Sequence, residues 1–229
     1  MDIGACFHQF EKWFSSNHGL RLQAELHTIL QDIDWHFWSG TFLQIGSLNQ
    51  NPWHHQLPLQ QQFIVAPGKS QGADLQAHPL HLPFASQSIE VLFSPFTLDL
   101  GLAQMPLLYE YDRVLKSMGI VIFVGVNRLG LWKLSRLMSW GRQKSWYQQT
   151  PGHSYWHLRH QMSTLGYHHY ASDFFHYLPP VQSKKYLDYF EGVHRIAKFI
   201  APYPPSFYYL IMQKQEASFN NALVYAKTD

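Results

Sequence analysis

Histidine is the residue type whose number and spacing first suggest chemistry in this sequence. The chain has 15 histidines among 229 residues, and His153, His157 and His160 have the spacing of one helix face. Imidazoles arranged in this way can bind zinc or iron, usually with a further ligand and often a carboxylate. Because Asp173 is the only acid that follows soon after, we favour a polar helix surface over a metal site and expect no bound metal.

Motifs of two common enzyme classes are absent from the sequence. There is no Gly-x-Ser-x-Gly motif around a nucleophilic serine, which argues against a hydrolase, and no Gly-x-x-x-x-Gly-Lys loop for phosphates. Cys6 is the only cysteine, so neither an intrachain disulfide nor a cysteine-based zinc site can form. The net charge of +2 is too small to indicate nucleic-acid binding.

The N-terminal sequence and the hydropathy pattern favour a cytoplasmic protein. The start, MDIGACFHQFEKWF, lacks the basic residues and long apolar run of a signal peptide. No window approaches the uninterrupted apolar length that a transmembrane helix needs. We therefore expect a soluble chain without a transmembrane segment.

Hydrophobic periodicity predicts strands and helices that alternate along the chain. Apolar runs closed by turn residues predict strands, and apolar residues three and four apart predict helices. The predicted helices are 19–33, a segment from Pro106, 129–140 and 155–165; the predicted strands are 41–45, 63–66, 89–94, 120–126, and two in YHHYASDFFHYL and FYYLIMQ. Such alternation predicts an α/β fold with a mostly parallel sheet covered on both faces.

The stretch TFLQIGSLNQN, residues 41–51, lies where this fold would bind a ligand. Its apolar strand runs into Gly46. In open parallel sheets, ligands bind outside the carboxyl ends of the strands. The residues around Gly46 are therefore the first candidates for a binding site.

Three segments in a fixed order resemble class I S-adenosylmethionine-dependent methyltransferases, in particular the type 11-like group. They are the strand and glycine FLQIG, the segment HPLHLPFASQSIEVLFSPFTLDL, and the segment LLYEYDRVLKSMGIVIFVGVN with its Glu-x-x-Arg-Val-Leu pattern. The segment NRLGLWKLSRLM is similar to that of a bacterial subset of these proteins. The resemblance covers roughly residues 41–127 and implies a Rossmann-like, seven-stranded, mostly parallel sheet whose last strand is antiparallel.

The resemblance also implies a cofactor and the residues that surround it. The cofactor would be S-adenosylmethionine, lying over Gly46. Glycines in this loop let the backbone approach the cofactor, and an acid orients it. The residues at the matching positions are Gln44, Ile45, Gly46, Ser47, His78, Pro79, Ser94 and Phe96.

The family pattern is altered at five places in this sequence. Gln44 stands where the family has an acid, and Leu48 stands where it has the second glycine. No carboxylate follows the strand 63–66, where the family's acid binds ribose. His78 replaces the acid that meets adenine, and Pro79 has no backbone N–H to donate. The glycine loop is therefore degenerate. Because each lost hydrogen bond costs about 1–3 kcal/mol, we expect the cofactor to bind more weakly.

Two functions are compatible with this pattern. One is an S-adenosylmethionine-dependent methyltransferase that acts on a small-molecule or lipid-like acceptor, with Asp99 and His153 as candidate bases. The other is a catalytically inactive methyltransferase-like binding or scaffold protein. A basic segment with tryptophans, 128–146, suits a lid, a packed helix or a membrane-surface helix.

The expected domain organisation is simple. Residues 1–40 form an N-terminal helical segment, and residues 41–229 form the methyltransferase-like domain with a helical insertion at about 128–150.

Overall fold

The protein folds around one mixed β-sheet. The structure is a computed structural model that describes residues 3–48, 51–54, 56–68, 70, 72–134, 153–178 and 204–216. The seven strands have the order β3-β2-β1-β4-β5-β7-β6. They are β1 (Thr41–Ile45), β2 (Gln61–Ala66), β3 (Leu75–Gln76), β4 (Ile89–Pro95), β5 (Leu115–Val126), β6 (Tyr167–Phe175) and β7 (Phe207–Lys214).

The strand directions match the sequence prediction. Neighbouring strands from β3 to β5 pair in parallel, whereas β7 pairs antiparallel with both β5 and β6. The predicted α/β, Rossmann-like fold with an antiparallel last strand is therefore confirmed.

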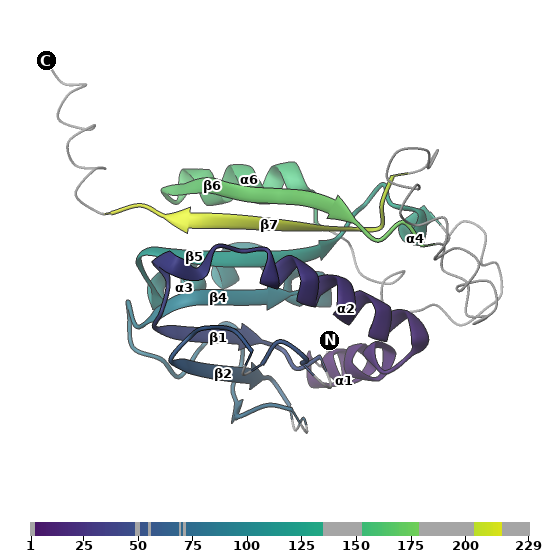
Figure 1. The fold of residues 1–229 in the computed structure, drawn as a ribbon, viewed down its shortest axis with the longest axis horizontal. Helices are drawn as coiled ribbons and strands as arrows, with labels where there is room; N and C mark the ends of the chain where they lie inside the picture. The colour runs from purple at the N-terminus through teal and green to yellow at the C-terminus, as the bar shows by residue number, and fades with distance from the viewer. Residues whose placement is uncertain are drawn as a thin grey trace, which may run out of the picture.

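Helices cover both faces of the sheet. Figure 1 shows α2 in front of the sheet, α3 and α6 behind it, and α1 at the ends of β1 and β2. The α-helices are α1 (Ile3–Phe14), α2 (Asn17–Gln31), α3 (Gln104–Val114), α4 (Leu131–Leu134) and α6 (Tyr155–Thr164), and the short 3₁₀ helices are η1 (Trp35–Phe37) and η2 (Thr97–Leu100). The hydroxyl of Ser16 caps α2 by accepting a hydrogen bond from the N–H of Gly19.

Alternating side chains of the central strands build two separate cores. Phe42 of β1 packs in the core beneath α1 and α2, whereas its neighbour Leu43 packs in the core beneath α3 and α6. Ile120 and Val121 of β5 divide in the same way. Both faces of these strands are thus buried, which explains their continuous apolar sequence.

The elements differ from the predicted ones in several places, and the two-residue strand β3 was not predicted. β5 begins at Leu115 rather than after Gly119, because Leu115 pairs with Ile89 before the register shifts. α1 was not among the individual helices predicted, although a helical segment was expected there. Of the helix predicted at 129–140, the structure describes residues up to 134, so most of the expected insertion at about 128–150 lies outside the described residues.

Candidate functional site

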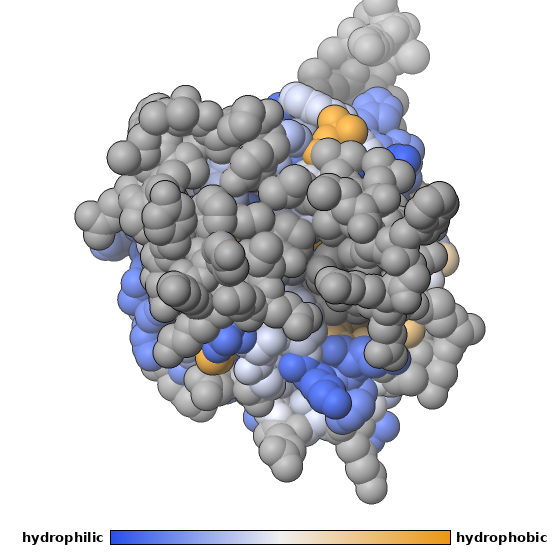
Figure 2. All heavy atoms as spheres, turned by 90° about the vertical axis from the view of Figure 1, so that its right-hand side faces the viewer, coloured by the Kyte–Doolittle hydropathy of each residue, from blue (hydrophilic) through white to orange (hydrophobic). Residues whose placement is uncertain are grey.

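The ends of four parallel strands bring the predicted site residues to one edge of the sheet. β1 pairs in parallel with β2 and β4, and β2 pairs in parallel with β3, so their carboxyl ends lie side by side. Gly46, the loop after β2, His78 and Phe96 follow these four ends. Figure 2 views this carboxyl edge, and most described residues that reach the surface there are hydrophilic.

Gln44 is the centre of a closed hydrogen-bond network. Its side chain is fully buried. Its Nε2 donates to the carbonyl of Gly46 and to Oδ1 of Asn51, each at 2.7 Å, and its Oε1 accepts from Nε1 of Trp53 at 2.8 Å. The same Asn51 oxygen accepts from the N–H of Leu48. Both polar atoms of Gln44 are therefore used in holding the loop that follows β1.

Helix α1 lies across the ends of β2, β1 and β4. A Cβ atom placed on Gly46 would lie 2.6 Å from Cε1 of Phe7, so the Phe7 ring fills the space beside this glycine. One turn earlier, a Cβ atom placed on Gly68 in the loop after β2 would lie 3.7 Å from Cα of Gly4. On its neighbouring face, α1 packs Phe10 against Phe96 with ring centroids 5.5 Å apart.

Gly46 itself needs the conformation that glycine allows. Its φ angle is 91°, in the left-handed region that other residues rarely adopt. Its N–H donates to the carbonyl of Val65 at 2.7 Å, which fastens the end of β1 to β2.

Glu11 brings a carboxylate from α1 to the loop after β2. Ser70 in that loop donates a side-chain hydrogen bond to it. The other oxygen is buried: Oε1 of Glu11 has no hydrogen-bond partner within the described part of the chain. Burial is the largest influence on the carboxyl group and raises its pKa, while Ser70 and the charge of His8 act in the opposite direction.

His78 is exposed, whereas Pro79 after it is buried. Nδ1 of His78 accepts a hydrogen bond from the N–H of Leu80 at 3.2 Å. In the neutral ring the proton is then on Nε2, so the exposed nitrogen is a donor rather than the acceptor that a carboxylate would provide.

Ser94, Ile45 and Phe96 are held inside the protein. Ser94 shares a hydrogen bond of 2.9 Å with the hydroxyl of Tyr111, and the carbonyl of Ile45 accepts from Oγ1 of Thr97. Ser47 is also buried and accepts from Nδ2 of Asn51. The eight predicted residues thus lie around one sheet edge, but His78 is the one whose side chain is exposed.

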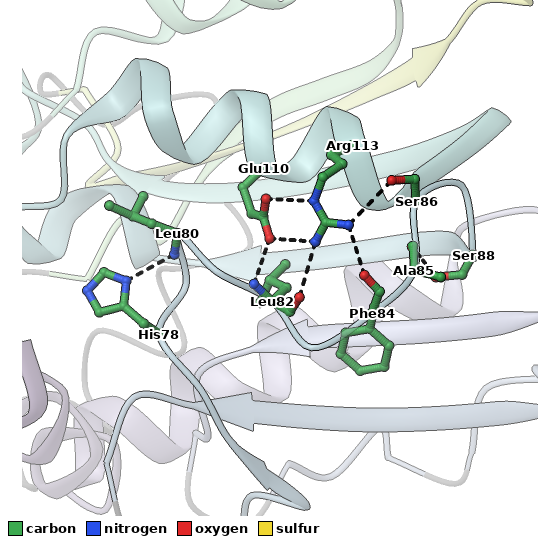
Figure 3. Close-up of polar contacts among 9 residues, drawn as sticks. All are labelled: His78, Leu80, Leu82, Phe84, Ala85, Ser86, Ser88, Glu110 and Arg113. Carbon is green, nitrogen blue, oxygen red and sulfur yellow. Dashed lines mark hydrogen bonds and ion pairs between the residues drawn. The ribbon is translucent and has the colours of Figure 1, made fainter.

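A carboxylate–guanidinium pair on α3 fixes the segment that leads from His78 into β4. Glu110 accepts from Arg113 through both oxygens, at 2.7 and 2.9 Å, and also from the N–H of Leu82. Arg113 donates in addition to the carbonyls of Leu82 and Phe84, as Figure 3 shows. The Glu-x-x-Arg pattern therefore positions the loop at 78–88 rather than binding a ligand directly.

A second candidate region is a pocket of about 710 Å³ beyond the ends of β5 and β6. Its lining mixes aromatic side chains with polar and charged ones, among them Arg128 and Asp173. The lining includes Tyr155, Trp156, Phe174 and Tyr177, together with Asn127 and His153.

Asp99 and His153, the two candidate bases, lie close together near this pocket. His153 bonds the carbonyl of Leu98 through Nε2 and Gln104 through Nδ1, so both ring nitrogens are occupied. Asp99 is buried, accepts from the N–H of Val126 with one oxygen, and has no partner for Oδ1 within the described residues. Burial raises the pKa of Asp99 to about 7, against the opposing effects of Val126, Lys133 and His153. A pKa near the working pH suits a general base, but Asp99 is buried and only His153 of the two lines the pocket.

The histidines do not form a metal cluster among the residues that the structure describes. No group of three or more histidine, cysteine or acidic side chains there has the arrangement of an ion site. His153, the first of the three spaced histidines, is bonded instead to Leu98 and Gln104. Within the same residues, no helix is long and apolar enough to span a membrane.

No protein-family model and no curated protein matches the sequence, but solved structures with a similar fold include several methyltransferases. A SAM-dependent methyltransferase from Archaeoglobus fulgidus shares 13% identity over 90% of this chain and 98% of its own, with a TM-score of 0.61. A possible histamine N-methyltransferase from Thermotoga maritima shares 15% identity over 91% of this chain and 100% of its own, with a TM-score of 0.58. The geranyl diphosphate C-methyltransferase of Streptomyces coelicolor, solved with S-adenosyl-L-homocysteine, shares 13% identity over 85% and 80%, with a TM-score of 0.54.

This chain has the class I methyltransferase fold. Within that fold, the residues at the carboxyl edge match an S-adenosylmethionine molecule at one end only. Beside β2, the unpaired oxygen of Glu11 can accept from ribose hydroxyls, and Nε2 of His78 can donate to an adenine nitrogen. Beside β1, Phe7 fills the space next to Gly46 and Gln44 is fully bonded. The methionine end of the cofactor fits this site only after Phe7 has moved.

Sequence reasoning missed the contribution of α1 to the methyltransferase-fold site. Phe7, Phe10 and Phe14 recur at the spacing of one helix face, and all three are buried. This pattern was the available signal for a helix that packs against the strand ends. Nothing in the pattern indicated that Glu11 would face the loop after β2.

Proposed function

We propose that this chain is an S-adenosylmethionine-dependent methyltransferase whose cofactor lies at the carboxyl edge of β1, β2 and β4. The order of the seven strands, with β7 alone antiparallel, is the observation that carries the proposal. Solved methyltransferases of similar fold support it, because the similarity extends over nearly their whole chains. The cofactor would supply an activated methyl group, and the chain would bind and align it.

The acceptor in this proposal is a small or lipid-like molecule with an apolar or aromatic body. The pocket lined by Tyr155, Trp156 and Phe174 supports this class, because such side chains bind apolar groups through contact area. His153, which lines the pocket, and Asp99, which is buried nearby, are the two candidates to take up a proton from the acceptor. In this arrangement the segment 1–40 covers a cytoplasmic methyltransferase domain of residues 41–229.

A thermal-shift titration with S-adenosylmethionine and S-adenosylhomocysteine tests the proposal. A ligand that binds only the folded state raises the melting temperature as its concentration exceeds the dissociation constant. We expect both compounds to raise it, with half-saturation in the micromolar to millimolar range. The absence of any shift at millimolar ligand, with both the native chain and the variant Phe7→Ala, would remove the methyltransferase proposal.

A second candidate function is a binding module on the same fold that has lost the cofactor. The hydrogen-bond network of Gln44 favours it. Both polar atoms of this amide are bonded within the protein, so neither is available to the charged methionine end of the cofactor. Leu48 favours it too, since this residue is fully buried in the core cluster beside Phe7. Under this candidate, the titration gives no shift, while a ligand of the aromatic pocket still binds. Association with membrane surfaces through 128–146 would be tested by liposome sedimentation at low salt.

A further inference from the structure

Glu11 has an unusual position for a carboxylate on an N-terminal helix. Its helix face is turned toward the strand-end loops, with Gly4 beside Gly68 and Phe7 beside Gly46. Ser70, after β2, donates to the Glu11 carboxylate. The side chain is therefore directed to the gap between the loops after β1 and β2, not to open solvent.

One oxygen of this carboxylate has nothing to bind within the described part of the protein. Oε1 is shielded from solvent and lacks a hydrogen-bond partner. A buried acceptor of this kind normally costs stability unless it is satisfied by a protein group, water or ligand. The arrangement is thus explained if a ligand brings a donor to this position.

Two carboxylates are described near the loop after β2: that of Asp74 already accepts from the N–H of Ile64, whereas Glu11 has an oxygen without a partner among the described residues. The segment Ala66-Pro67-Gly68-Lys69 at the end of β2 contains no carboxylate. A pair of neighbouring hydroxyls on a sugar is well matched to a carboxylate, which has two oxygens that accept hydrogen bonds and none that donate.

We propose that Glu11 of α1 binds the ribose hydroxyls of an adenosine-containing ligand at the ends of β1 and β2. This assignment rests on the proposed function and adds to it a binding residue from outside the sheet. α1 then has two roles, since Phe7 blocks the methionine end while Glu11 serves the ribose end. The protein then recognises the ribose through a residue of α1, and not through a residue that follows β2.

The test compares Glu11→Gln with the native chain in calorimetric titrations with S-adenosylhomocysteine. The amide keeps the size of the side chain but loses the charge and one acceptor. We expect the dissociation constant to rise about ten- to hundredfold, as for the loss of a charge-assisted hydrogen bond. Lys12→Gln, on the exposed neighbour in α1, serves as the matched control and should leave the dissociation constant unchanged.

Two nucleosides make the test specific for the hydroxyl groups. The native chain should bind adenosine more tightly than 2′,3′-dideoxyadenosine, and Glu11→Gln should bind the two about equally. If both proteins prefer adenosine by the same factor, Glu11 does not contact the ribose and the inference is wrong, although the proposed function stands. If neither the native chain nor Phe7→Ala binds S-adenosylhomocysteine, the proposed function fails as well.

A stability measurement separates binding from a structural role. Because the unpaired carboxylate is costly to bury, the free Glu11→Gln protein should melt at the same temperature as the native chain or higher. A clear fall in the melting temperature together with weaker binding would show that Glu11 holds α1 in place, and would overturn the inference.

Discussion

Gln44 stands where the methyltransferase pattern has an acid, and its hydrogen bonds leave no place for a carboxylate in this structure. Its Nε2 donates to two oxygens at 2.7 Å, those of Gly46 and Asn51. In Gln44→Glu a carboxylate oxygen would face both oxygens inside the protein. We expect the free energy of unfolding to fall by roughly 2–4 kcal/mol, measured by urea denaturation. A variant as stable as the native chain, with tighter cofactor binding, would show that the network is not closed.

Asp99 gives a prediction for the pH dependence of stability. Its folded pKa of about 7 lies above the usual value of 3.8, so the folded state retains a proton that the unfolded state loses. The free energy of unfolding should therefore fall as the pH rises from about 4 through 7, by roughly 4 kcal/mol in total from this group.

The variant Asp99→Asn removes this titration. Its free energy of unfolding should change less between pH 5 and pH 8, and it should exceed that of the native chain at pH 8. The comparison uses urea denaturation at several pH values, with the exposed Asp32→Asn as control. An unchanged slope in Asp99→Asn would contradict the assignment.

The sequence predicted the positions of these residues better than their partners. Gln44 and Gly46 follow from a strand that ends in a turn. The bonds of Gln44 to Asn51 and Trp53 depend on an irregular loop, whose path has no periodic signal. The raised pKa of Asp99 depends on burial beneath packed elements, which the local sequence does not reveal.

Among the elements, α1 covers the candidate site, because its Phe7 ring fills the space beside Gly46. Phe7 and Phe10 are both buried on this helix, but Phe7 fills the space at Gly46 and Phe10 packs on Phe96. Replacing either by alanine should cost about 3–5 kcal/mol of stability. Only Phe7→Ala should also tighten binding of S-adenosylhomocysteine, by tenfold or more, in a calorimetric titration. Equal affinities of the two variants would argue against a blocking role for Phe7.

The regular elements were largely predictable because their side chains repeat with strand or helix periods. β1 matches its predicted range, and α6 differs from its predicted range by one residue. α1 was harder to predict. Its aromatic face belongs to the core at the strand ends, and the neighbouring sequence has no strand pattern that indicates this partner. The start of β5 was misplaced, since the polar residues Lys116 and Ser117 interrupt the apolar run that defines the strand.

At the scale of the whole molecule, the fold and its chemistry are specified separately. The seven-stranded, mostly parallel sheet with an antiparallel last strand, which the resemblance implied, is confirmed despite identities of 13–15% to solved methyltransferases. The alternation of buried side chains on the strands and the α3 pair of Glu110 and Arg113 help to hold this frame. The candidate ligand-binding residues lie on loops and on α1, so they can change while the frame is kept.

A crystal structure of the chain grown with S-adenosylhomocysteine would show directly whether the cofactor binds at this edge of the sheet. We expect ligand density at the ends of β1 and β2, with the ribose hydroxyls on Glu11 and the Phe7 ring moved away from Gly46. Crystals grown at millimolar ligand that show Phe7 still against Gly46, and no ligand at this edge, would contradict this expectation.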